Sequence, residues 1–143
     1  MSSWVRRAEP GDPAGTFGIG TVYRLPEHAE GQLPAGDGTA LPAILSTLDR
    51  TPSYLATVVC LEVSAAADLR SVEASAGVRA HWFSRDDDLR PDIFVLEAMC
   101  RASLPSGRSA AQAAGESRLA ATLRRHLGND RAVPKRDISF FSY

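Results

Sequence analysis

The stretch Tyr54-Leu-Ala-Thr-Val-Val-Cys-Leu-Glu-Val63 decides the fold class of this 143-residue chain. It is rich in β-branched and aliphatic residues, and it is too apolar to face water on either side. Strands of this kind lie inside sheets whose two faces are both covered by helices. The stretch therefore predicts a buried central strand with helices packed on the sheet that contains it.

Three other segments have the periodicity of amphipathic helices. In residues 39–50, apolar side chains recur at helical spacing from Leu41 to Leu48, and Pro42 falls in the first turn, where a missing N–H is tolerated. Residues 65–76 and the Ala-rich residues 109–127 predict two further helices. Residues 92–100 leave both possibilities open, because their β-branched start favours a strand and their Leu-Glu-Ala-Met end favours a helix.

The remaining segments predict strands and an irregular beginning. Residues 78–85 and 138–143 alternate like strands, whereas the first 38 residues are dense in glycine and proline. Within that region only residues 17–25 predict a strand, and residues 26–38 predict a surface loop. We expect a single globular domain over residues 1–143 with an irregular Gly/Pro-rich region at 1–38. Its class would be α/β or α+β, with a four- to five-stranded mixed sheet and helices packed on it.

Composition excludes several classes of protein. No apolar run is long enough to span a membrane and no signal peptide is recognised, which predicts a cytoplasmic protein. We expect it to be a small domain of bacterial type. Two cysteines are too few for a disulfide scaffold or a four-cysteine zinc site. The three histidines do not have the spacing of metal ligands. We therefore expect neither a metal nor a cofactor.

Two glutamates inside apolar segments are the strongest candidates for a reactive carboxylate. Glu62 lies in residues 54–63 and Glu97 in residues 92–100. A carboxylate buried without a partner takes up a proton, which is how many enzymes obtain a general acid. Arg24 is a possible partner of either glutamate. Whether Glu62 and Glu97 are buried stays open, since each could lie at the end of an element and touch water.

The residues around Arg24 and Glu97 resemble parts of an NAD-using family. Thr21-Val-Tyr-Arg24 is similar to the NAD-binding first strand of the ADP-ribosyltransferase toxins. Glu97, followed by Leu104-Pro105, resembles the position of their catalytic glutamate before an Ile-Pro pair. The resemblance implies that Arg24 holds NAD and that Glu97 polarises its ribose. Because the two matches are short, we assign no family from them.

Charge and aromatic residues are unevenly placed along the chain. Residues 1–100 carry 8 arginines and 14 acidic residues, whereas residues 101–143 carry 8 basic and 3 acidic residues. Aromatic and arginine side chains are enriched at protein interfaces. We therefore predict a surface that binds a protein partner or a second copy of this chain. Its predicted residues are Arg124, Arg125, Arg136, Phe140, Phe141 and Tyr143.

The leading functional hypothesis is a small protein-binding or accessory domain without catalytic activity, because no catalytic constellation is complete. The alternative is a small enzyme that uses Glu97 with Arg24 and acts on NAD or another nucleotide. A second alternative is nucleic-acid binding through the basic C-terminal third. The net charge of −1 and the absence of aromatic residues among those arginines disfavour it.

Overall fold

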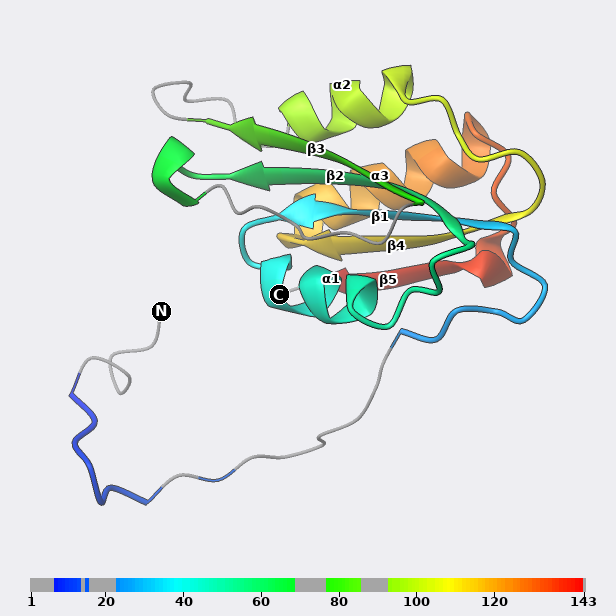
Figure 1. Ribbon diagram of the computed structural model, residues 1–143. Helices are drawn as coiled ribbons and strands as arrows, with labels where there is room; N and C mark the ends of the chain where they lie inside the picture. Colours follow the sequence, from blue (N-terminus) through cyan, green and yellow to red (C-terminus); the bar gives the residue numbers. More distant parts are fainter. Residues whose placement is uncertain (1–6, 14, 16–22, 69–76, 86–92, 143) are drawn as a thin grey trace.

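A five-stranded sheet forms the centre of the computed structural model, which describes residues 7–13, 15, 23–68, 77–85 and 93–142 (Figure 1). The strands lie in the order β3-β2-β1-β4-β5, and every neighbouring pair is parallel. The elements are β1 (Gly31–Asp37), α1 (Leu41–Leu48), β2 (Ala56–Val63), the 3₁₀ turn η1 (Ala66–Asp68), β3 (Val78–Ser84), α2 (Ile93–Arg101), β4 (Ser109–Gly115), α3 (Ser117–Asn129), the 3₁₀ turn η2 (Lys135–Asp137) and β5 (Ile138–Ser142).

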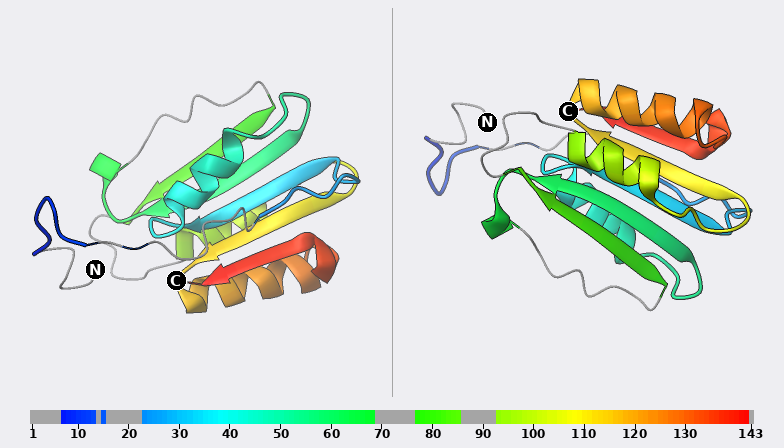
Figure 2. Two further views of the ribbon diagram at one scale, coloured as in Figure 1. Left: turned by 90° about the horizontal axis from the view of Figure 1, so that it is seen from below. Right: turned by 90° about the horizontal axis from the view of Figure 1, so that it is seen from above.

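Helices cover both faces of the sheet, α1 on one side and α2 with α3 on the other (Figure 2). The side chains of β2 accordingly alternate between the two covered faces of the sheet. Val58 and Cys60 belong to the cluster that includes Leu119 of α3, whereas Val59 and Leu61 pack with Ile44 of α1. The prediction of a strand buried on both faces at residues 54–63 is therefore confirmed.

The predicted mixed sheet is wrong, and so is the α+β alternative, because the sheet is parallel throughout and the class is α/β. Parallel strands need a connection that crosses a face of the sheet and returns to the starting edge. Residues 92–100 predict either a strand or a helix, and the described part of that segment belongs to α2, which lies between β3 and β4.

The central strand β1 lies where the sequence predicted a surface loop and an irregular region. Its sequence, Gly31-Gln-Leu-Pro-Ala-Gly-Asp37, contains residues that usually interrupt strands, yet six of its seven residues are buried. The glycines are required by close packing. A Cβ atom at Gly36 would clash with the carbonyl oxygen of Ala114 on β4, and one at Gly31 would clash with the side chain of Pro105.

The helix predicted over residues 109–127 is a strand followed by a helix. Residues 109–115 form β4, which is buried along its whole length between β1 and β5, and α3 begins only at Ser117. The alanines of Ser-Ala-Ala-Gln-Ala-Ala-Gly favour a helix locally, but burial in the sheet overrides that propensity. Their small side chains leave room for α3 to pack closely on β4.

Other predictions are confirmed or lie outside the described residues. The strands expected at 78–85 and 138–143 are β3 and β5, and α1 lies within the helix predicted at 39–50. Of the helix predicted at 65–76, residues 66–68 form η1 and residues 69–76 are outside the described part. Most of the strand predicted at 17–25 is also outside it. Among the described residues, no helix is long and apolar enough to cross a membrane.

Candidate functional site

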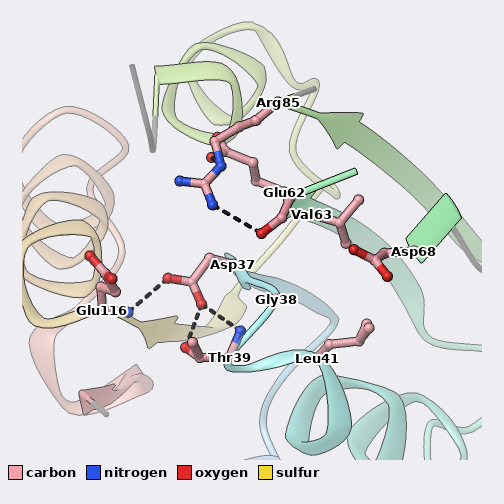
Figure 3. A pocket seen from close by; sticks show the side chains of 10 residues that line it. Asp37, Gly38, Thr39, Leu41, Glu62, Val63, Asp68, Arg85 and Glu116 are labelled. Carbon is pink, nitrogen blue, oxygen red and sulfur yellow. Dashed lines mark hydrogen bonds and ion pairs between the residues drawn. The ribbon is translucent and has the colours of Figure 1, made fainter. Parts of the chain in front are cut away.

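A crevice opens at the carboxyl ends of β1, β2 and β4 and has a volume of about 350 Å³ (Figure 3). From β1 the chain proceeds to β2 and β3 on one side, and later to β4 and β5 on the other. In open parallel sheets, ligands bind outside the carboxyl ends of the strands where the strand order changes direction in this way. The crevice is lined by Asp37, Gly38, Thr39, Leu41, Glu62, Val63, Ser64, Asp68, Arg85 and Glu116.

Asp37 joins the two loops that border the crevice. Its Oδ1 accepts hydrogen bonds from the backbone N–H, 2.8 Å away, and the hydroxyl of Thr39. Its Oδ2 accepts one from the backbone N–H of Glu116, also at 2.8 Å. Gly115 has φ +137°, and a Cβ there would lie 2.8 Å from the Asp37 carboxylate. Asp37 therefore holds the ends of β1 and β4 together.

Glu62 and Arg85 form the opposite wall of the crevice. The Glu62 side chain is 1% exposed, and its Oε1 lies 3.4 Å from Nε of Arg85. The guanidinium also donates to the hydroxyl of Ser64 at 3.0 Å. Because Arg85 follows β3 directly, this ion pair ties the ends of β2 and β3 together beside the crevice, as Figure 3 shows.

The described lining of the crevice is acidic. It contains four carboxylates, those of Asp37, Glu62, Asp68 and Glu116, and one guanidinium, that of Arg85. Backbone is accessible at Gly38, since a Cβ there would meet nothing within 4 Å. Such a site suits a ligand that offers hydroxyl or amide groups to the carboxylates and lies against open backbone.

The structure separates the predicted pair Glu97 and Arg24. Glu97 is exposed on α2, lies 3.6 Å from Arg101, and lines a groove of about 580 Å³ beside β3. Arg24 is exposed and follows Tyr23, whose hydroxyl donates to Gln32 at 3.2 Å. Leu33 and Ala35 face α2 and α3, so alternation places Gln32 on the α1 side. The sheet thus lies between Glu97 and the segment that holds Arg24.

The aromatic residues near the C-terminus divide between two faces of β5. Phe141 packs against the cluster beside α1, whereas Phe140 is 36% exposed and the Arg124 guanidinium lies 5.5 Å from the centre of its ring. Arg125 and Arg136 are exposed, and Tyr143 lies outside the described residues. The strand β5 pairs with β4 at one edge of the sheet. Contact with a second chain stays a prediction.

The sequence identified Glu62 in this crevice and missed Asp37, Thr39, Arg85 and Glu116. Three of these four residues lie at or directly after the end of a strand. The sequence predicts a loop at Asp37 because glycine and proline in β1 oppose a strand, and it predicts a helix at Glu116 because the alanines of β4 favour one. A correct assignment of the parallel strands would have located them, since strand ends of one sheet meet at one edge.

Comparison with known proteins gives a consistent result. Residues 29–143 match the family model described as SIP, siderophore-interacting protein. The ferric vibriobactin reductase ViuB of Vibrio cholerae is 28% identical over 142 residues, which cover 98% of this chain and 52% of ViuB. The chain thus spans about half the length of this curated relative.

Three solved structures share the fold. A siderophore utilization protein from T. fusca has a TM-score of 0.72 and 28% identity over 96% of this chain and 52% of that one. The siderophore-interacting protein SipS from Aeromonas hydrophila has a TM-score of 0.70 and 23% identity, covering 82% and 48%. The siderophore-interacting protein from Acinetobacter baumannii has a TM-score of 0.70 and 21% identity, covering 98% and 56%.

These matches correct the leading functional hypothesis. A non-catalytic protein-binding domain is contradicted by a curated relative that is a reductase, and the enzyme alternative is favoured over it. The family that matches differs from the ADP-ribosyltransferase toxins suggested by the residues around Arg24 and Glu97. Since the family model covers residues 29–143, the chain belongs to the siderophore-interacting protein family.

Proposed function

We propose that this chain is the dinucleotide-binding part of a ferric-siderophore reductase. A reductase needs an electron donor, and the relative ViuB is a ferric vibriobactin reductase. The crevice at the carboxyl ends of β1 and β4 is the place where open parallel sheets bind dinucleotides. This position is the observation that carries the proposal. The chain spans about half of ViuB, so the proposal gives it the dinucleotide-binding step and not the whole reaction.

The residues at the end of β2 fit the ribose of a nicotinamide dinucleotide, and the open backbone at Gly38 leaves room beside it for the rest of the ligand. Glu62 lies near the end of the second strand, where dinucleotide-binding folds carry an acidic residue that binds a ribose hydroxyl. Gly38 leaves backbone open beside the first strand, so a ligand can approach closely there. Asp37 already accepts three hydrogen bonds, which partly offset its charge. Glu62 and Ser64 would hold the ribose, and residues 37–39 would lie along the middle of the ligand.

A nicotinamide dinucleotide can supply the electrons that the proposed reductase needs. A reduced nicotinamide, when bound, supplies a hydride, which is two electrons with one proton. Ferric iron bound to a siderophore is the substrate, and its reduction to ferrous iron takes one electron, so one hydride would supply the electrons for two ferric ions. Reduced nicotinamides are kept in the cytoplasm, and we propose that the protein works there.

Binding of a dinucleotide to the 143-residue chain tests this proposal by isothermal titration calorimetry. Gly38→Leu places a branched side chain in the crevice wall without a clash, because nothing lies within 4 Å of its Cβ position. Gly15→Leu is the matched control, since Gly15 also has open space around it and lies outside the crevice. We expect the wild type to bind NADH or NADPH, Gly38→Leu to weaken binding by about tenfold or more, and Gly15→Leu to have no effect.

Two results would contradict the proposal. One is a folded wild-type chain that binds neither dinucleotide. The other is a Gly38→Leu variant that binds as tightly as the Gly15→Leu control.

A further inference from the structure

We propose that the crevice selects dinucleotides that have a free 2′-hydroxyl, so that it prefers NADH to NADPH. This inference rests on the proposed function and adds the class of dinucleotide. It also assigns a role to Glu62. By holding Arg85 in an internal ion pair, Glu62 makes the one guanidinium among the described crevice residues a poor binding group for a phosphate.

The geometry at the end of β2 carries the inference. Nε of Arg85 lies 3.4 Å from Oε1 of Glu62, and Nη2 of Arg85 donates to Ser64 at 3.0 Å. Two sides of the guanidinium are therefore turned toward protein groups. The Arg85 side chain is only 34% exposed and that of Glu62 is 1% exposed. Figure 3 shows the pair in the wall of the crevice.

The local charge gives the direction of the preference. A 2′-phosphate carries between one and two negative charges at neutral pH. Near the end of β2 it would meet Glu62 and the exposed Asp68, with Arg85 already paired. Like charges within a few ångströms of each other at a partly buried site repel appreciably. A ribose hydroxyl would instead donate a hydrogen bond to a carboxylate at the same place.

The opposite preference requires a free arginine. In folds of this kind an arginine beside the second strand accommodates the 2′-phosphate of NADP, and Arg85 is in a suitable position. Its contacts with Glu62 and Ser64 argue against that use. Removing the charge of Glu62 while keeping a hydrogen-bond acceptor would leave Arg85 in place without its ion pair to Glu62. Glu62 is in this sense a positioning residue that determines specificity through Arg85.

The test compares the affinities of NADH and NADPH for four forms of the 143-residue chain by calorimetry. These are the wild type, Glu62→Gln, Asp68→Asn and the control Asp49→Asn, whose exposed carboxylate follows the far end of α1. We expect the wild type to bind NADH about tenfold more tightly than NADPH. Glu62→Gln is expected to raise the affinity for NADPH about tenfold. It should weaken NADH binding a few-fold, because an amide oxygen is a poorer acceptor for the ribose hydroxyl than a carboxylate. Asp68→Asn should raise the affinity for NADPH a few-fold, and Asp49→Asn should change neither.

The dependence of the NADH preference on salt distinguishes charge repulsion from a purely structural role of Glu62. Repulsion of a phosphate is screened by ions, so the preference for NADH should shrink as ionic strength rises. The Asp68→Asn variant replaces an exposed side chain, so it decides the matter even where Glu62→Gln does not fold.

The outcomes separate this inference from the proposed function. Equal affinities of the wild type for the two dinucleotides, or a preference for NADPH, would overturn the inference and leave the proposed function standing. A preference for NADH that Asp68→Asn leaves unchanged and that does not depend on salt would also overturn it. Binding of neither dinucleotide would overturn both.

Discussion

The carboxylate of Asp37, at the end of β1, accepts a hydrogen bond from the backbone N–H of Glu116, 2.8 Å away at the beginning of α3. This contact joins the two strands between which the order of the sheet changes direction. The same carboxylate orders the loop before α1 through Thr39. One side chain therefore sets the shape of the edge at which we propose that a dinucleotide binds.

Replacing Asp37 with Asn should destabilise the protein and weaken dinucleotide binding. The amide can keep one acceptor, but its NH₂ group would then face a backbone N–H of either Thr39 or Glu116. Loss of a charged acceptor of this kind costs about 1–3 kcal/mol in the free energy of unfolding, measured by urea denaturation. Asp49→Asn, which alters an exposed carboxylate after α1, should stay within about 0.5 kcal/mol of the wild type.

Gly115 should not tolerate a side chain, whereas Gly38 should. Gly115 has φ +137° and its Cβ position lies 2.8 Å from the Asp37 carboxylate, while nothing lies within 4 Å of the Cβ position of Gly38. Gly115→Ala is expected to lower the free energy of unfolding by about 1–3 kcal/mol. Gly38→Ala should change it by less than about 0.5 kcal/mol. Equal effects of the two substitutions would show that Gly115 is not held in this conformation.

Leu61 should contribute strongly to stability through the cluster beside α1. Its side chain is fully buried there with Ile44 and Val59. Leu61→Ala should lower the free energy of unfolding by about 2–5 kcal/mol, as for other buried leucines. Tyr54→Ala is the control, because Tyr54 is 86% exposed. A loss below about 0.5 kcal/mol for Leu61→Ala would contradict the placement of β2.

Asp137 should make stability depend on pH in the acid range. Burial of this carboxyl would raise its pKa, but hydrogen bonds and charge from Arg108 and His28 outweigh burial and lower the pKa below its ordinary value of 3.8. A pKa lowered by folding stabilises the protein above the ordinary value, and that stability is lost as pH falls below 3.8 through the folded-state value. Unfolding of the wild type and of Asp137→Asn between pH 7 and pH 2 measures this contribution. The difference in stability between the two should shrink below about pH 4, and a constant difference would contradict the assignment.

The sequence supported the elements whose local signals agree with their burial. Val58 to Leu61 form a β-branched and aliphatic run, and such a run predicts a strand covered on both faces. The helical spacing from Leu41 to Leu48 predicts α1 for a similar reason. In both segments local propensity and tertiary packing favour the same structure.

The strands β1 and β4 were not predicted from the sequence, because tertiary packing there favours a strand and the local propensity of the residues does not. Gly36 is needed since a side chain would meet the backbone of Ala114, and the small side chains of Ala111 and Ala113 let α3 pack closely on β4. Read locally, glycine indicates a loop and alanine a helix. The candidate site could not be predicted either, because Asp37 and Glu116 are recognised as site residues only once it is known that Asp37 ends β1 and Glu116 follows β4.

The most direct test of dinucleotide binding at the carboxyl edge is an NADH titration of the ¹⁵N-labelled chain followed by NMR. If a dinucleotide binds there, backbone amide signals of residues 36–39, 62–64 and 115–117, together with that of Arg85, should shift progressively to saturation. Signals from the groove beside β3, including Arg79, His81 and Glu97, should stay in place. An unchanged spectrum, or shifts confined to that groove, would contradict the account.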